Sequence, residues 1–119
     1  MTILRFGGYQ PERSVHTRAA RLFGEALGTS LGDAIDFQLT PQITAAGHQA
    51  ADLLSLTESG ELDMCYFASS YLAARVPELG LLDLPFPGTD RARMWQRLDG
   101  AIGARIKAAV AARTGYTVL

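Results

Sequence analysis

The chain has 119 residues, of which 48% are hydrophobic and 19% are charged. That length suffices for one domain with a hydrophobic core, and the composition excludes an intrinsically disordered chain. The formal net charge of −1 offers no electrostatic footprint for nucleic acid, so we expect no nucleic-acid partner. No apolar run approaches the roughly 20 residues that a helix needs to cross a bilayer.

Strand and helix patterns alternate along the first half of the chain. The expected elements are a strand at 3–6, a helix from Val15 with Ser14 as its cap and Gly28 and Gly32 at its end, a strand at 34–39, a helix between Gly47 and Gly60, and a strand at 62–67. The order β-α-β-α-β predicts an α/β fold, in which helices flank a parallel sheet.

Helical spacing also predicts which side chains are buried. The apolar positions of the first helix are Val15, Ala19, Leu22, Phe23, Ala26 and Leu27, and those of the second are Ala50, Leu53, Leu54 and Thr57. We expect both sets to face the sheet.

The second half of the chain is less regular. A short helix is expected at 69–75, and the prolines of 77–88 exclude a long element there, although its leucines should pack against the body. Residues 116–119 begin another strand. Because a domain seldom ends inside such a run, we expect the chain to be part of a longer protein.

A final helical stretch should fill the region between these segments. Asp90 is expected to cap it, and it should run to about Arg113 with breaks near Gly100 and Gly103. Trp95 is expected to anchor one face of it in the core.

The carboxyl ends of parallel strands are where ligands of an open α/β sheet bind. Three loops follow those ends, at 7–13, 40–49 and 68–71, and they hold many neutral hydrogen-bonding side chains and little charge. Such groups suit a polar solute, especially an anion near helix N-termini. The candidate ligand-binding residues are Tyr9, Gln10, His48, Gln49, Ser69, Ser70 and Tyr71, in a wider set that adds Ser14, His16 and Gln42.

The residues do not support catalysis or a bound cofactor. The sequence at 7–10 matches neither a dinucleotide fingerprint nor a Walker loop, and the only lysine is Lys107 in the final helix. His16 and His48 are far apart in the sequence and Cys65 is the only cysteine, so we expect no zinc site and no intrachain disulfide. Cys65 lies in an apolar run and is expected to be a small buried thiol.

Three segments form a longer pattern. They are Leu4-Arg5-Phe6-Gly7 with Ser14-Val15-His16 and a helix holding Ala19, Ala20 and Phe23; Gly47 through Leu53-Leu54 to Gly60-Glu61-Leu62-Asp63-Met64; and Val76-Pro77-Glu78-Leu79 with Leu82-Asp83-Leu84-Pro85-Phe86 and Leu98-Asp99-Gly100. Together they cover almost the whole chain in order. This pattern resembles the opening of the DctP-type solute-binding proteins of tripartite ATP-independent periplasmic (TRAP) transporters.

The resemblance implies the first lobe of a two-lobed periplasmic-binding-protein-like fold, with residues 1–119 as an incomplete lobe and the second lobe absent from this sequence. It implies a periplasmic carrier, not an enzyme, that delivers a small organic anion to the TRAP membrane subunits. This chain shows no signal-peptide pattern. The family's ligand contacts fall at Tyr9, at His48-Gln49 and at Ser69-Ser70, whereas its carboxylate-pairing arginine lies beyond residue 119.

An incomplete lobe should expose apolar surface and a sheet edge, which predicts homodimerisation or aggregation. We also expect it to bind solute weakly or not at all.

Two other interpretations compete with the carrier. A stand-alone flavodoxin-like α/β domain with a regulatory or ligand-binding role has the β-α-β-α-β order in its favour. The missing phosphate loop and the unfinished strand at 116–119 count against it. An enzyme that uses His48 or Cys65 ranks last.

Overall fold

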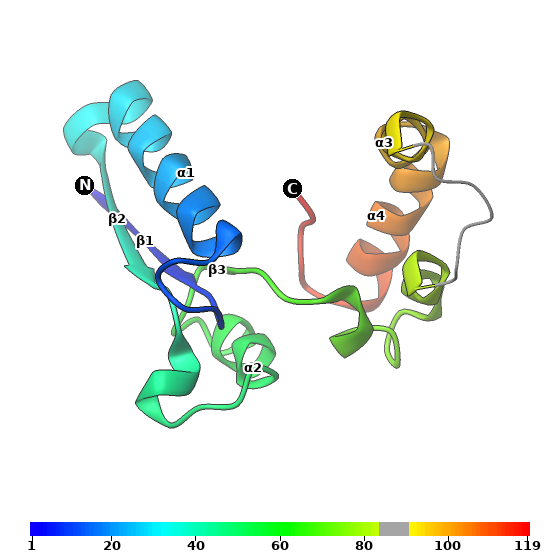
Figure 1. Cartoon of the computed structure of the whole chain (residues 1–119), viewed down its shortest axis with the longest axis horizontal. Coiled ribbons are helices and arrows are strands. Elements are labelled where there is room, and N and C mark those ends of the chain that lie inside the picture. Colours follow the sequence, from blue (N-terminus) through cyan, green and yellow to red (C-terminus); the bar gives the residue numbers. More distant parts are fainter. Residues whose placement is uncertain (84–90) are drawn as a thin grey trace. The chain divides into compact units, whose positions relative to one another are not determined.

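A computed structural model describes residues 1–83 and 91–119, which fall into two compact units, Met1–Phe67 and Ala68–Leu119. The first unit contains three parallel strands, β1 (Thr2–Gly7), β2 (Ile35–Thr40) and β3 (Met64–Cys65), in the spatial order β2-β1-β3. Helix α1 (Val15–Leu31) connects β1 to β2, and α2 (Asp52–Glu58) precedes β3 (Figure 1). The predicted α/β class and parallel β-α-β-α-β order are confirmed.

The two helices cover opposite faces of the sheet, because side chains alternate along β1. Phe6 points toward α1, where its ring centroid lies 6.3 Å from that of Phe23 and 6.0 Å from that of Phe37 on β2. Gly7 faces the other way, and a Cβ placed on it would meet the side chains of Leu53 and Leu62. Leu53 of α2 is fully buried.

The start of α1 is fixed by its cap, as predicted. The Ser14 hydroxyl accepts a hydrogen bond from the backbone N–H of Thr17 at 3.1 Å, which satisfies one of the free amides of the first turn. The helix runs through Gly28 and ends at Leu31, and its cap Gly32 has a φ of 53°, a positive value that glycine adopts without strain.

The buried face of α1 differs from the prediction. Four of the six apolar positions expected to face the sheet are exposed: Val15, Ala19, Leu22 and Ala26. The helix buries Thr17 and Ala20 instead. Gly24 explains the rotation, because it lets the helix approach the Phe37 ring so closely that a Cβ at this position would overlap it.

The second helix and third strand are shorter than the sequence suggested. After β2 the chain forms a 3₁₀ turn at Ile43–Ala46, and α2 begins only at Asp52, so His48 and Gln49 precede the helix. Strand β3 has two residues instead of six.

An ion pair continues the contact between β1 and the chain before β3. The Asp63 N–H donates to the Arg5 carbonyl at 2.9 Å, and the Arg5 N–H donates to Asp63 Oδ2 at 2.8 Å. The Arg5 guanidinium also donates to the same carboxylate from Nε at 2.9 Å and from Nη2 at 3.2 Å. The Arg5 guanidinium and backbone N–H lower the pKa of the Asp63 carboxyl.

The second unit begins with 3₁₀ turns at Ser69–Tyr71 and Pro77–Asp83, where a short helix and a packed proline-rich segment were predicted. Its helices are α3 (Arg91–Asp99) and α4 (Ala101–Arg113), which lie side by side. Its buried side chains are Leu72, Val76, Leu79, Ile106 and Val110. The Arg113 guanidinium donates to the Glu78 carboxylate at 2.7 Å.

Several expectations for the second unit are corrected. The break between helices falls at Gly100, whereas Gly103 lies inside α4, where a Cβ would overlap the Leu98 carbonyl. Trp95 is 57% exposed and does not anchor the core. Residues 116–119 form no strand. The expected Asp90 cap lies outside the described residues.

Candidate functional site

The loops after β1 and β2 are joined at the carboxyl edge of the sheet. The Gly8 N–H donates to the Thr40 carbonyl at 2.9 Å, and the Ile43 N–H donates to the Gly8 carbonyl at 3.0 Å. Tyr9 and Gln42 form an isolated antiparallel bridge just beyond. These backbone bonds hold the first loop, which carries Tyr9 and Gln10, firmly against the second.

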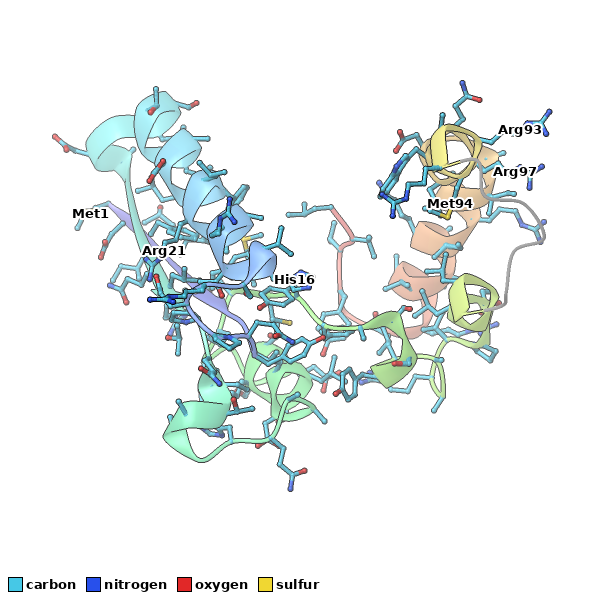
Figure 2. The ribbon with its side chains drawn as sticks, viewed as in Figure 1. Met1, His16, Arg21, Arg93, Met94 and Arg97 are labelled. Atoms are coloured by element: carbon cyan, nitrogen blue, oxygen red, sulfur yellow. The ribbon has the colours of Figure 1, made fainter. Side chains whose placement is uncertain are left out.

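Three rings gather at the same edge. Tyr66, the first residue after β3, stacks on His16 with ring centroids 5.3 Å apart and planes inclined by 25°. The Tyr66 ring also lies 5.4 Å from that of Tyr9. His16 is in the first turn of α1, as Figure 2 shows. We call Tyr9, His16 and Tyr66 the edge cluster.

Gly8 makes room for the edge cluster. A Cβ on Gly8 would lie 2.6 Å from Cε1 of Tyr66, 2.9 Å from its hydroxyl oxygen and 2.8 Å from the Pro41 carbonyl oxygen. The Tyr66 ring therefore occupies the space that any other residue at position 8 would fill.

The hydroxyl of Tyr66 is buried and has no hydrogen-bond partner among the described residues. Burial raises the pKa of this phenol, an effect that the nearby backbone amides of Tyr9 and Gln10 partly offset. Thr17 cannot donate to it, because its hydroxyl proton is shared between the carbonyl oxygens of Gln10 at 3.1 Å and Pro11 at 2.9 Å. An unsatisfied buried hydroxyl costs stability and calls for an explanation.

The edge also meets the N-terminus of α1, where backbone amides carry partial positive charge. No acidic side chain lies in the first turn of this helix, so no carboxylate offsets that charge locally. Glu12, which precedes the helix, is paired with Arg21, and this pairing lowers the pKa of the Glu12 carboxyl. The surroundings of the edge cluster thus favour an anion or a polar group over a cation.

The predicted site residues fall into separate groups. Tyr9 and Gln10 lie on the first loop beside Tyr66. His48 and Gln49 are exposed on the second loop, where their contacts are local: His48 Nδ1 lies 3.5 Å from Asp52 Oδ2, and the Gln49 N–H donates to the same oxygen at 2.8 Å. No described hydrogen bond joins them to the edge cluster. Ser69, Ser70 and Tyr71 belong to the second unit.

Tyr66 is the site residue that the sequence-based prediction missed. It was counted inside a six-residue strand, and the strand ends one residue before it. An aromatic residue placed immediately after a buried parallel strand is the signal that could have identified it, because that position faces the ligand edge.

The described residues also bear on metal binding, thiol reactivity and membrane spanning. Residues 1–83 and 91–119 contain no group of three or more His, Cys, Asp or Glu side chains that could hold a metal ion. Burial raises the pKa of the Cys65 thiol, which makes the reactive thiolate scarce. None of the described helices is long and apolar enough to span a membrane.

Comparison with known proteins then decides the family. Residues 6–119 match the profile of DctP, the bacterial extracellular solute-binding protein family 7. The chain belongs to this family. The sheet order alone would also suit a flavodoxin-like domain, but a match over nearly the whole chain decides for DctP.

Individual relatives agree with this assignment. The chain is 31% identical over 107 residues to the 2,3-diketo-L-gulonate-binding periplasmic protein YiaO of Escherichia coli, an alignment that covers 90% of this chain and 32% of the relative. It is 26% identical to a TRAP periplasmic solute-binding protein of Roseobacter denitrificans with bound L-galactonate, with a TM-score of 0.81 and coverage of 94% of this chain and 36% of that one.

A second solved structure gives the same result. A TRAP periplasmic solute-binding protein of Xanthobacter autotrophicus with bound β-D-galacturonate is 25% identical, with a TM-score of 0.77 and coverage of 92% and 36%. The chain therefore spans about a third of the length of the relatives that it matches.

Proposed function

We propose that this chain supplies part of the first lobe of a periplasmic solute-binding protein of a TRAP transporter. In this role it helps to bind a small organic acid and deliver it to the membrane subunits, and it catalyses no reaction. The observation that carries the proposal is the edge cluster: three rings beside a helix N-terminus at the carboxyl edge of a parallel sheet, on a chain of the DctP family.

The cluster favours a hydroxylated sugar acid among organic acids. Flat ring faces pack against the C–H faces of a sugar chain, and neutral side chains such as Gln10 can donate and accept hydrogen bonds with hydroxyl groups. The N-terminus of α1 favours the carboxylate. Relatives whose names or structures include diketogulonate, galactonate and galacturonate support this class.

The predicted site residues enter this proposal with two additions. Tyr9, Gln10, His48, Gln49, Ser69, Ser70 and Tyr71 remain the proposed contacts of this lobe, and His16 and Tyr66 join them through the edge cluster.

An NMR titration of the chain with D-galacturonate tests the proposal. We expect amide shifts at the first loop, the first turn of α1 and the residues after β3, and we expect sodium chloride at equal ionic strength to leave them unmoved. His16→Ala should weaken the response about threefold or more, since one stacking partner is lost. Trp95→Ala, which removes an exposed aromatic ring from the other unit, is the matched control.

Two results would refute a contribution of the edge cluster to solute binding. One is an absence of shifts at these residues up to about 50 mM ligand, far beyond the about 1 mM Kd that corresponds to −4.1 kcal/mol. The other is an equal response to neutral D-galactose, because the carboxylate would then contribute nothing.

A further inference from the structure

Helix α1 exposes an apolar stripe on the face that turns away from the sheet. Val15 is 68% exposed and Leu22 is 65% exposed, and both Ala19 and Ala26 are exposed between and beyond them. At 100° per residue these four positions lie within about 60° of one another around the helix. We call them the α1 stripe. Exposed apolar side chains that line up in this way mark a contact surface more often than scattered ones do.

The spacing of the α1 stripe is the same when it is read from either end. The steps from 15 to 19, 22 and 26 are four, three and four residues, so an antiparallel copy of the helix presents the same spacing in reverse. In that register Val15 faces Ala26 of the other copy, and Ala19 faces Leu22. Every large side chain therefore meets a small one, which lets two helices approach closely with interlocking side chains.

The charges beside the α1 stripe fit the same arrangement. Arg18 and Glu25 lie on one flank of the helix, and within the described ranges neither side chain forms an ion pair. In an antiparallel pair, equivalent flanks of the two helices face each other. Glu25 of the other copy then lies two residues, about 3 Å along the helix axis, from the point directly opposite Arg18, which is within reach of these long side chains, and the reciprocal pair forms as well. Opposite charges across a contact favour this register over its alternatives.

We propose that the α1 stripe is a self-association surface, and that its partner is a second copy of this chain packed antiparallel through α1. This inference is independent of the proposed carrier function. The contact is symmetric, so it closes at two copies and does not propagate. Because only one helix of each copy contributes to the contact, we expect it to be weak, with a dissociation constant on the order of 100 µM.

Sedimentation equilibrium of the chain between about 10 µM and 1 mM tests the proposal. We expect a monomer–dimer equilibrium that Leu22→Glu weakens at least about tenfold, because it places two carboxylates in an apolar contact. Ile102→Glu is the matched control: it makes the same change at a side chain of α4 that is 46% exposed, and it should leave the equilibrium unchanged. Circular dichroism checks that both variants fold. We expect them to fold because the two replaced side chains are exposed.

Charge reversal separates the antiparallel register from nonspecific apolar contact. Arg18→Glu and Glu25→Arg should each weaken dimerisation a few-fold, about the effect of an exposed ion pair, and the double variant should recover the original constant. A monomer at every concentration, association beyond dimers, or equal loss with Leu22→Glu and Ile102→Glu would overturn the proposal. Failure of the double variant to recover would overturn the antiparallel register.

Discussion

The hydroxyl of Tyr66 is the residue-scale feature that the fold alone does not account for. It is buried, and it has no hydrogen-bond partner within residues 1–83 and 91–119. Leaving such a group unsatisfied costs about 1–3 kcal/mol, whereas the ring that carries it is well packed against Tyr9 and His16. We therefore expect this hydroxyl to destabilise the isolated chain.

Replacing this residue by phenylalanine should raise stability. Tyr66→Phe keeps the ring and removes the unsatisfied oxygen, so we expect the free energy of unfolding to increase by up to about 1 kcal/mol. Urea denaturation at pH 7 measures the change. A loss of stability on this substitution would mean that the hydroxyl has a hydrogen-bond partner in solution.

Gly8 permits the packing of the same ring, and its replacement should have the opposite effect. A Cβ here would lie 2.6 Å from the Tyr66 ring and 2.8 Å from the Pro41 carbonyl oxygen, and the backbone carbonyl cannot move aside cheaply. We expect Gly8→Ala to destabilise the chain by about 1–3 kcal/mol in urea denaturation.

Gly28 is the matched control for that substitution. It lies inside α1 with nothing within 4 Å of an added Cβ, so Gly28→Ala should stabilise the chain by about 0.5–1 kcal/mol through helix propensity. Equal effects at the two positions would contradict the packing described for Tyr66.

At the scale of elements, β3 pairs with β1 over only two residues, and the Arg5–Asp63 pair extends that contact along the chain before β3. The pKa of the Asp63 carboxyl is lower in the folded chain than the ordinary value of about 3.9, with hydrogen bonds from Arg5 as the main cause. As the pH falls, the Asp63 carboxyl of the unfolded chain therefore binds a proton at a higher pH than the same carboxyl of the folded chain does. The stabilisation by the Arg5–Asp63 pair is complete above the pKa that Asp63 has in the unfolded chain. It is lost as the pH falls through the lower pKa that Asp63 has in the folded chain.

Asp63→Asn should remove that pH dependence. Between pH 6 and pH 3 the urea midpoint of the variant should fall less than that of the parent chain, and added salt should reduce the difference because both side chains are partly exposed. Asp33→Asn, which removes one carboxylate from the 3₁₀ turn after α1, is the control. A parent and variant with parallel profiles would contradict the role given to this pair.

The bounds of an element were predictable where local sequence signals and burial agreed. The buried face of an element was less predictable where close packing between side chains determined it. The cap at Ser14 and the first two strands follow from local chemistry and alternation, and the structure confirms them. The face of α1 does not follow, because Gly24 allows an approach to Phe37 that helical periodicity cannot express. The prediction that Trp95 is buried was wrong for a related reason. Hydrophobicity predicts burial only when a neighbouring element covers the side chain, and Trp95 is exposed.

The candidate site was predictable as a place but not as a set of contacts. Parallel topology identifies the carboxyl edge, and Tyr9 and Gln10 lie there. The stacking of Tyr66 on His16 depends on where β3 ends: the strand ends at Cys65 and not at residue 67, which moves an aromatic ring from the strand to the candidate site. The contribution of Ser69 and Ser70 stays a prediction.

At the scale of the whole molecule, the length of the chain limits what it can bind. It spans about a third of its relatives, and pockets for small ligands bury about 70–90% of the ligand surface. The edge cluster lies at a single edge of one sheet, so we expect it to contact a ligand from one side only. We therefore expect D-galacturonate or succinate to bind this chain no more tightly than about 1 mM, which corresponds to −4.1 kcal/mol.

Isothermal titration calorimetry of the chain with each acid measures this limit, and a full-length member of the family with its own ligand is the positive control. The chain should give no heat of binding beyond dilution at ligand concentrations where the control saturates. Micromolar binding by this chain would show that the carboxyl edge of its sheet alone encloses the solute, since open contact on one side cannot recover the entropy lost on association. That outcome would place the affinity of the site within residues 1–119 instead of in the parts of the relatives that this chain does not span.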